Sequence, residues 1–349
     1  MVRSPNSPFK RVYMKKYILN EDENIVISSL TDNILKKYNS VEDEEFLVHA
    51  GLLAHDLPLG LRSFLHDFKQ YEDTHPTCVI GGYKIDDERI GKSPQHWKEK
   101  KDCSSAINEE IYFVLCASLI GHPIAWSTQQ GGHIMHEIFP IKQHEKDQLG
   151  FSSKEYLEWH TEDAFHPLRG DYIALMCIRN PTHTPTMIAS NTEIDLTLEE
   201  YKPLFSPIFK IRPDNSHLQK NTDEKDSYLT KAQKAMQDLN IQPVEIPVLF
   251  GDPKSPYWRL DPYFMETPED ENAKNALNLL IKAIDKNLKE VIVHPGEIFF
   301  CDNYRVVHGR APFSANYDGW DRWLKRLNIA NDLRKSRGIR TSGTSRIFY

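Results

Sequence analysis

The sequence has few cysteines, no long apolar run and no concentration of positive charge, and each shortage excludes a class of protein. No apolar run approaches the length needed to cross a bilayer, and the N-terminal stretch "MVRSPNSPFKRVYMKKYILN" lacks the continuous apolar core of a secretory signal. A net charge of −7 without a basic stripe argues against nucleic acid as the main partner. The five cysteines are odd in number, form no C-x-x-C pair and indicate reduced thiols: Cys78, Cys103, Cys116, Cys177 and Cys301. We therefore expect a cytoplasmic protein that binds neither nucleic acid nor membrane.

The 349 residues, 40% of them hydrophobic, predict one domain with a sizeable core. Residues 1–120 look mainly helical: "ENIVISSLTDNILKKYNS" spaces its apolar residues at three and four, and "SSAINEEIYFVLCASLIG" opens with a serine cap and closes at Gly121. Short apolar runs between Gly, Pro and Asn turns then predict a β-rich core over residues 121–335. Within it, Tyr172 to Ile178 is apolar almost throughout, as in a central strand.

Two further segments complete the expected organisation. The polar stretch 217–230 has weak periodicity, and we interpret it as a lid over a small substrate. A late helix is expected to have Thr267 as N-cap, Pro268 in its first turn and Asp270 at N3. It presents one apolar stripe, made of Ala273, Ala276, Leu277, Leu280, Ile281, Ile284 and Leu288. The whole pattern predicts a mainly β protein with flanking helices, a double-sheet barrel of the jelly-roll type.

The stretch "WHTEDAFHPLRGDY" carries the first candidate site. On a β-strand, His160 and Glu162 would point to the same face and offer an imidazole and a carboxylate to one point. An isolated H-x-E pair more often faces water, so a third ligand is needed before the pair can be interpreted as a metal site. His308 ends the apolar run "RVVH" and supplies it. Two histidines and one carboxylate form the facial triad of non-haem Fe(II) oxygenases.

Two arginines lie beyond the third ligand, in "GWDRWLKRLNIAND". The guanidinium of Arg322 offers a rigid fork of donors suited to the far carboxylate of 2-oxoglutarate, and Arg326 would lie on the same side of the chain. Either arginine alone could be a surface ion-pair partner. A zinc hydrolase could use the same triad but would have no use for Arg322. A non-catalytic jelly-roll binder would retain the strands but need not keep all three ligands.

Three segments together resemble the clavaminate synthase-like Fe(II)/2-oxoglutarate oxygenases: "WHTEDAFHPLRGDYIALMCIRN", "IRPDNSH" and "DNYRVVHGRAPF…DGWDRWLKRLN". The similarity covers most of residues 110 to 335 and is closest to hydroxylases of free basic amino acids. It implies a double-stranded β-helix fold. It also implies His160, Glu162 and His308 as Fe(II) ligands, Arg322 on 2-oxoglutarate, and O2 as the oxidant.

The resemblance also implies substrate contacts, and the side-chain cation of the amino acid needs an acidic partner because an unpaired buried charge is costly. A single carboxylate suits the compact ammonium of lysine, so the sequence favours free L-lysine, hydroxylated at C3 or C4. L-arginine or ornithine is the alternative, and a homo-oligomer stays open. The implied contacts are Arg326 on the carboxylate, Gln129 and Glu162 on the backbone amine, Asp214, Ser216, Asp252 and Asp261 near the amine or side chain, and Thr186 on the co-substrate.

Overall fold

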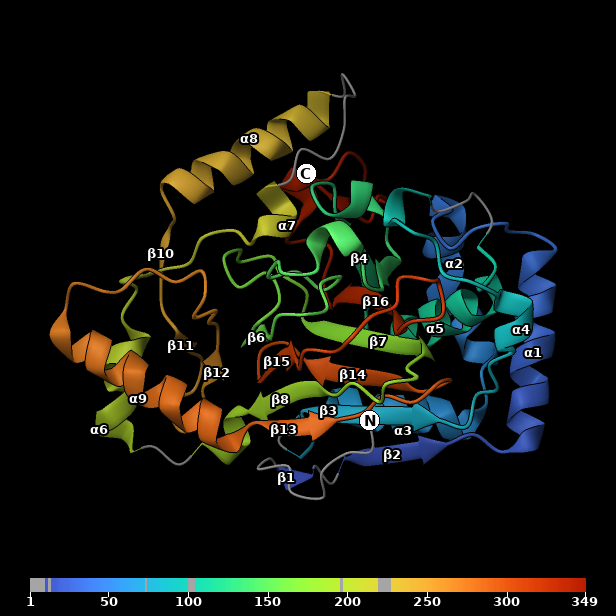
Figure 1. Cartoon of the computed structure of the whole chain (residues 1–349), viewed down its shortest axis with the longest axis horizontal. Coiled ribbons are helices and arrows are strands. Elements are labelled where there is room, and N and C mark those ends of the chain that lie inside the picture. Colours follow the sequence, from blue (N-terminus) through green and yellow to red (C-terminus); the bar gives the residue numbers. More distant parts are fainter. Residues whose placement is uncertain (1–9, 12–13, 73, 100–103, 195–196, 219–226) are drawn as a thin grey trace.

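The computed structural model describes residues 10–11, 14–72, 74–99, 104–194, 197–218 and 227–349. Two β-sheets face each other at its centre (Figure 1). The larger sheet has the strand order β17-β4-β16-β7-β14-β3-β2, with β5 beside β16. The smaller has the order β1-β13-β8-β15-β6. This arrangement confirms the predicted double-stranded β-helix.

The strands of the larger sheet are mostly antiparallel; its members are β2 (Lys15–Ile18), β3 (Thr77–Gly81), β4 (His122–Trp126), β5 (His136–Ile138), β7 (Tyr172–Arg179), β14 (Ile298–Asp302), β16 (Trp323–Ala330) and β17 (Ile347–Phe348). The smaller sheet contains β1 (Lys10–Arg11), β6 (Leu157–His160), β8 (Thr186–Ser190), β13 (Lys289–Val291) and β15 (Val306–Arg310). Two short ribbons stand apart, β9 (Phe209–Lys210) with β10 (Glu245–Ile246), and β11 (Leu249–Phe250) with β12 (Tyr257–Trp258).

The surroundings of strand β7 explain why its sequence is apolar on both faces. It pairs with β14 on one side and β16 on the other, and all eight of its residues are buried. Alternate side chains pack against the helices (Tyr172, Ala174, Met176) and against the facing sheet (Ile173, Leu175, Cys177). The prediction of a central core strand is therefore confirmed.

Helices cover the outer faces of both sheets (Figure 1). The larger sheet packs against α1 (Glu21–Leu35), α2 (Glu44–Leu53), α3 (Leu59–Gln70) and α5 (Ile107–Ile120). The apolar stripe of α9 (Glu271–Asn287) packs with Met187, Ala189 and Val307 of the smaller sheet, as the sequence predicted. The remaining helices are α4 (Asp87–Ile90), α6 (Leu198–Tyr201), α7 (Asn215–Leu218) and α8 (Ser227–Ile241). Among the described residues, no helix is long and apolar enough to span a membrane.

Two predicted helix starts are wrong. Helix α9 begins after Asp270, whose carboxylate accepts the amide of Ala273 at 2.7 Å, so the N-cap is Asp270 and not Thr267. Helix α5 begins after Ala106, which has no capping side chain, because the Ser104 hydroxyl instead donates to Glu110 at 2.7 Å. Several polar residues precede each helix, but only Asp270 caps α9 and none of them caps α5.

Parts of the expected organisation differ in the structure. The N-terminal segment contributes strands β2 and β3 to the larger sheet, in addition to its helices. Residues 219–226 of the predicted lid lie outside the described residues, and its two ends belong to α7 and α8. The four described cysteines are buried and free, and Cys103 lies outside the described residues.

Candidate active site

The side chains of His160, Glu162 and His308 meet at one point between the sheets. Strands β6 and β15 pair so that His160 lies directly opposite His308, with ring centroids 4.7 Å apart. The Glu162 Oε2 atom lies 3.6 Å from His160 Nε2 and 3.3 Å from His308 Nε2. This Oε2 atom is buried and has no hydrogen-bond partner. Two imidazole nitrogens and an unpartnered carboxylate oxygen fit a divalent ion with open coordination positions.

Glu162 reaches this point from a turn and not from a strand. Strand β6 ends at His160, so the alternation argument that placed both side chains on one strand face was wrong in detail. The turn is held by the buried side chain of Asn303, which accepts the Glu162 amide at 2.9 Å and donates to the carbonyls of Glu162 and Gly170 at 3.1 and 2.8 Å. Asn303 was not predicted as a site residue from the sequence.

Hydrogen bonds and charges around the three residues suit a cation. The backbone carbonyl of Glu158 lies 2.8 Å from His160 Nδ1, which fixes the ring hydrogen there and turns Nε2 toward Glu162. Burial lowers the pKa of His160, but the contact with Glu162 and the charge of Asp261 raise it to about 9. Burial would raise the pKa of Glu162, yet Arg326 and both histidines hold it well below its usual range. Burial, together with the charges of His160 and Arg326, lowers the pKa of His308 and favours its neutral form, which can bind a metal.

Gly309, between two of the predicted residues in H-G-R, has a steric role. A Cβ atom at this position would lie 2.6 Å from the carbonyl oxygen of Leu157 on the neighbouring strand. The pairing of β15 with β6 also shifts register between His308 and Arg310. Only glycine permits this close approach, which keeps His308 opposite His160.

Arg322 lies in the same cavity, just before β16. Its side chain is buried, its Nε has no hydrogen-bond partner, and burial lowers its pKa to about 10. Within the described part of the chain, no carboxylate pairs with it. Arg310 also lines the cavity, but its guanidinium is bound to the Ser152 carbonyl at 2.7 Å and the Glu155 carbonyl at 3.1 Å. No hydrogen bond of the Arg322 guanidinium is found among the described residues, so it can bind an anion, and Thr186 lines the same cavity.

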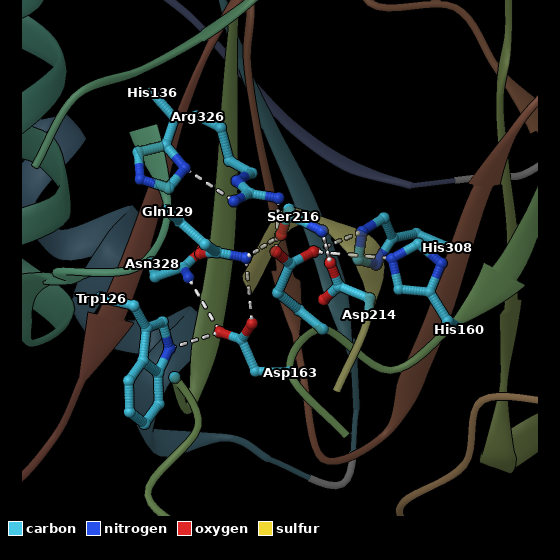
Figure 2. Close-up of polar contacts among 12 residues, drawn as sticks. Trp126, Gln129, His136, His160, Asp163, Asp214, Ser216, His308, Arg326 and Asn328 are labelled. Carbon is cyan, nitrogen blue, oxygen red and sulfur yellow. Dashed lines mark hydrogen bonds and ion pairs between the residues drawn. The ribbon is translucent and has the colours of Figure 1, made fainter. Parts of the chain in front are cut away.

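The predicted substrate contacts Gln129, Asp214 and Ser216 line the same cavity, close to His160 and His308 (Figure 2). Gln129 Nε2 donates to Ser216 Oγ at 2.8 Å, and Asp214 accepts the Ser216 amide at 2.8 Å. Asp261 accepts the amides of Tyr263 and Phe264 at 3.1 and 3.3 Å. Burial and the negative charge of Asp214 raise the pKa of Asp261, the positive charge of His160 lowers it, and the result is a pKa of about 6. The fold thus brings two of the three candidate acids into one cavity.

The third candidate acid, Asp252, does not join them. Its side chain is exposed, and it accepts the Lys254 amide at 3.0 Å in a turn between β11 and β12. It is not among the residues that line the cavity. The prediction for Asp252 was wrong because an Asp two residues before a turn amide serves the turn, and its short side chain cannot also reach inward.

Arg326 lines the same cavity and contacts Glu162 and His136. Its Nη1 forms an ion pair with Glu162 Oε1, and its Nη2 lies 2.7 Å from His136 Nδ1 (Figure 2). His136 was not predicted. In "GGHIMHEIF" it is one of two histidines, and nothing in the sequence distinguishes it from the more exposed His133.

A buried network around Asp163, the residue after Glu162, supports the substrate side. Trp126 Nε1 and Asn328 Nδ2 donate to Asp163 Oδ2 at 2.8 and 3.2 Å (Figure 2). Asp163 Oδ1 lies 2.9 Å from His217 Nε2, in helix α7. His217 is fully buried, so the start of the predicted lid is fixed to the core beneath Asp214 and Ser216.

Comparison with known proteins gives the family. Residues 113–328 match the model of the taurine catabolism dioxygenase TauD, TfdA family. An L-ornithine/L-arginine 3-hydroxylase of Catenulispora acidiphila is 41% identical over 96% of this chain and 100% of its own, and an enduracididine beta-hydroxylase of Streptomyces hygroscopicus is 40% identical over 95% and 98%. An L-lysine 3-hydroxylase of Catenulispora acidiphila is 30% identical over 66% of this chain and 61% of its own.

Solved structures of the non-heme iron oxygenase OrfP superpose over 96% of this chain and 100% of their own. The complex with Fe, succinate and (3S)-hydroxy-L-Arg has a TM-score of 0.90 at 41% identity. The complex with Fe and alpha-ketoglutaric acid has a TM-score of 0.85, and the complex with Fe and L-Arg one of 0.81. The resemblance predicted from the sequence is confirmed, and the chain belongs to the TauD, TfdA family of dioxygenases, the Fe(II)/2-oxoglutarate oxygenases.

Proposed function

We propose that the protein hydroxylates free L-arginine, or a closely similar basic amino acid such as ornithine, at C3. Lysine, which the sequence alone favoured, is less well supported. The relatives that match nearly the whole chain act on ornithine, arginine or enduracididine by name, whereas the lysine 3-hydroxylase matches less of it. The observation that carries the proposal is the pair of acids, Asp214 and Asp261, in the cavity that also holds the three metal-binding side chains.

The iron end of the cavity is assigned to five side chains. His160, Glu162 and His308 would hold Fe(II), which together with 2-oxoglutarate and O2 supplies the oxidising power to replace a C–H bond by C–OH. Arg322 would bind the far carboxylate of 2-oxoglutarate, because it is buried and has no anionic partner among the residues that the structure describes. The Thr186 hydroxyl would donate to the same co-substrate. The remaining reactivity depends on which carbon the protein holds nearest the metal.

The amino acid would be held at both ends. Arg326 would receive its carboxylate, while Gln129 and the Glu162 oxygen that faces Arg326 would meet its amine. Asp214 and Asp261 would face the side-chain cation. The planar guanidinium of arginine offers several donors in one fork and suits two carboxylates better than a compact ammonium does. The reason for preferring lysine was the absence of a close acid pair, and folding brings two of those acids together.

The zinc hydrolase considered for the same triad is not supported. The chain belongs to a dioxygenase family, and a hydrolase has no use for Arg322. The Arg322 guanidinium is buried and pairs with no carboxylate among the described residues, and an anionic ligand beside the triad would offset the cost of that burial.

A competition assay tests the proposal. The protein is incubated with Fe(II), ascorbate, 2-oxoglutarate and equal concentrations of arginine, ornithine and lysine, and each amino acid is examined by mass spectrometry for the gain of one oxygen. We expect hydroxyarginine as the dominant product, with the hydroxyl at C3 by NMR and one succinate formed for each hydroxylation. Dominant hydroxylysine would contradict the arginine assignment and restore the original preference. Omitting 2-oxoglutarate is the control and should abolish product.

A further inference from the structure

We propose that His136 is a positioning residue that fixes the guanidinium of Arg326, and through it the carboxylate end of the amino acid substrate. This inference rests on the proposed function, since Arg326 matters only if an amino acid binds. Strands β5 and β16 pair so that His136 is directly opposite Arg326. The His136 Nδ1 atom lies 2.7 Å from Arg326 Nη2, and both residues line the cavity (Figure 2).

The contact defines the state of the imidazole ring. A guanidinium carries only donors, so His136 Nδ1 must accept and cannot carry a hydrogen. The ring is then neutral and has its hydrogen on Nε2, because a protonated ring would place a second positive charge against Arg326. With 3% of its surface exposed, His136 lies away from bulk water, which would otherwise compete for the bond.

Arg326 is thereby held from two sides. Its Nη2 donates to His136 and its Nη1 pairs with Glu162 Oε1, so the plane of the guanidinium is set by two acceptors on different strands or turns. The Nε of Arg326 is buried and has no hydrogen-bond partner. An arginine side chain loses rotamer entropy when it is ordered. His136 orders the guanidinium before the substrate carboxylate binds, so carboxylate binding does not include that entropy loss.

The opposite face of the same strand pair explains why His136 stays in place. Glu137, the next residue on β5, accepts from Lys325 Nζ at 2.5 Å and from Trp323 Nε1 at 2.7 Å. The Gln130 side chain also accepts the Glu137 amide and donates to its carbonyl, each at 2.9 Å. Strand β5 is therefore fixed to β16 by Glu137 on one face, while His136 projects to the other face and into the cavity.

Substitutions at His136 separate a positioning role from a packing role. His136→Phe keeps a planar ring and removes the acceptor, whereas His136→Asn places an amide oxygen near the position of Nδ1. We expect His136→Phe to raise the apparent KM for arginine about tenfold, the loss of one hydrogen bond to a charged group. The amount of hydroxyarginine formed per succinate should also fall. His136→Asn should restore most of the affinity for arginine and most of the product formed per succinate. The KM for 2-oxoglutarate should change less than twofold in either variant. His133→Asn is the matched control.

The role through Arg326 is tested by a double-mutant cycle with Arg326→Lys. If His136 acts by holding the guanidinium, His136→Phe should add less than a twofold change in the Arg326→Lys background. A full tenfold effect in that background, or equal damage in the Phe and Asn variants with the two KM values rising together, would overturn the positioning role. An unchanged arginine KM in His136→Phe would overturn it as well.

One further measurement does not depend on the substrate, and so separates failure of this inference from failure of the proposed function. Nitrogen-15 NMR of histidine-labelled, zinc-loaded protein should show His136 as the neutral ring with hydrogen on Nε2 and an accepting Nδ1, a signal that shifts in Arg326→Lys. A protonated ring, or a signal insensitive to Arg326, would contradict the inference. Wild-type protein that hydroxylates none of arginine, ornithine or lysine would instead contradict the proposed function.

Discussion

The two sides of the cavity are built differently. The iron wall, which we define as His160, Glu162, His308, Thr186 and Arg322, lies on paired strands or within two residues of their ends. The amino-acid wall, defined as Gln129, Asp214, Ser216 and Asp261, lies on turns, the short helix α7 and the loop after β12. Arg326 lines the same cavity and pairs with Glu162 of the iron wall. Strands place side chains more accurately than loops do, and loops are easier to vary.

This difference separates the chemistry from the choice of substrate. The iron wall is held by the sheet hydrogen bonds of β6, β8, β15 and β16, which are part of the family fold. The amino-acid wall depends on side-chain bonds such as Gln129 to Ser216, and on the anchoring of His217 by Asp163. Substitutions on the first wall should therefore impair metal binding or the use of 2-oxoglutarate, and those on the second should change which amino acid is accepted.

The largest effect is expected at the metal ligands. His160→Ala and His308→Ala should each lower 2-oxoglutarate turnover by about a thousandfold or more, because removal of one ligand leaves too few to hold Fe(II). Succinate formation measures the loss, and His55→Ala, an exposed histidine on the N-terminal helical side, is the control. Wild-type-like turnover in either variant would remove these residues from the iron wall.

A smaller effect is expected at Arg322. Arg322→Lys keeps the charge but loses the two-donor fork, so the apparent KM for 2-oxoglutarate should rise about 10- to 100-fold. The KM for arginine should change little. Arg310→Lys is the comparison, because Arg310 is bound to backbone carbonyls; it should lower the thermal unfolding temperature more than it changes the KM. If Arg310→Lys raised the KM for 2-oxoglutarate and Arg322→Lys did not, Arg310 would be the residue that binds the co-substrate.

Substitution of Asn303 tests whether metal binding depends on the hydrogen bonds that fix the turn carrying Glu162. Asn303→Ala removes three hydrogen bonds that fix the turn carrying Glu162, and should weaken metal binding about 10-fold, at the lower end of what outer contacts contribute to metal sites. Titration with Co(II), followed by its absorption spectrum, measures the affinity. Unchanged affinity would mean that the turn holds its shape without Asn303.

The smallest of these effects is expected for one acid on the amino-acid wall. Asp261→Asn should raise the KM for arginine about tenfold, because one charged hydrogen bond to the guanidinium is lost. Steady-state kinetics with arginine measure this change. Asp252→Asn, on the exposed turn, should leave every constant within twofold; a comparable effect there would place Asp252 at the substrate after all.

The sequence predicted the iron wall better than its surroundings. The residue types of the triad and of Arg322 are set by chemistry, and their spacing is visible along the chain. The strand thought to carry both His160 and Glu162 ends at His160, because Asn303 holds the following turn from 141 residues away. No local pattern encodes such a contact. His136 escaped notice for the same reason, since its role follows from strand pairing with Arg326.

The substrate preference was less predictable because it depends on distances that the chain only acquires by folding. Asp214, Asp252 and Asp261 are equivalent candidates in the sequence, and the structure separates them into two cavity residues and one turn residue. Helix boundaries failed similarly: three polar residues precede α9, and Asp270 alone caps it. The apolar stripe of α9 and the apolar strand β7 were predicted correctly, because burial determines their patterns directly.

The separation of the two walls is the central claim, and the Asp214→Asn/Asp261→Asn double variant tests it most directly. Its apparent KM values for arginine and for 2-oxoglutarate are measured beside those of the wild type. We predict that the KM for arginine rises about 100-fold, from the loss of two charged hydrogen bonds, while the KM for 2-oxoglutarate stays within twofold. An unchanged KM for arginine, or an equal rise in both values, would contradict the claim.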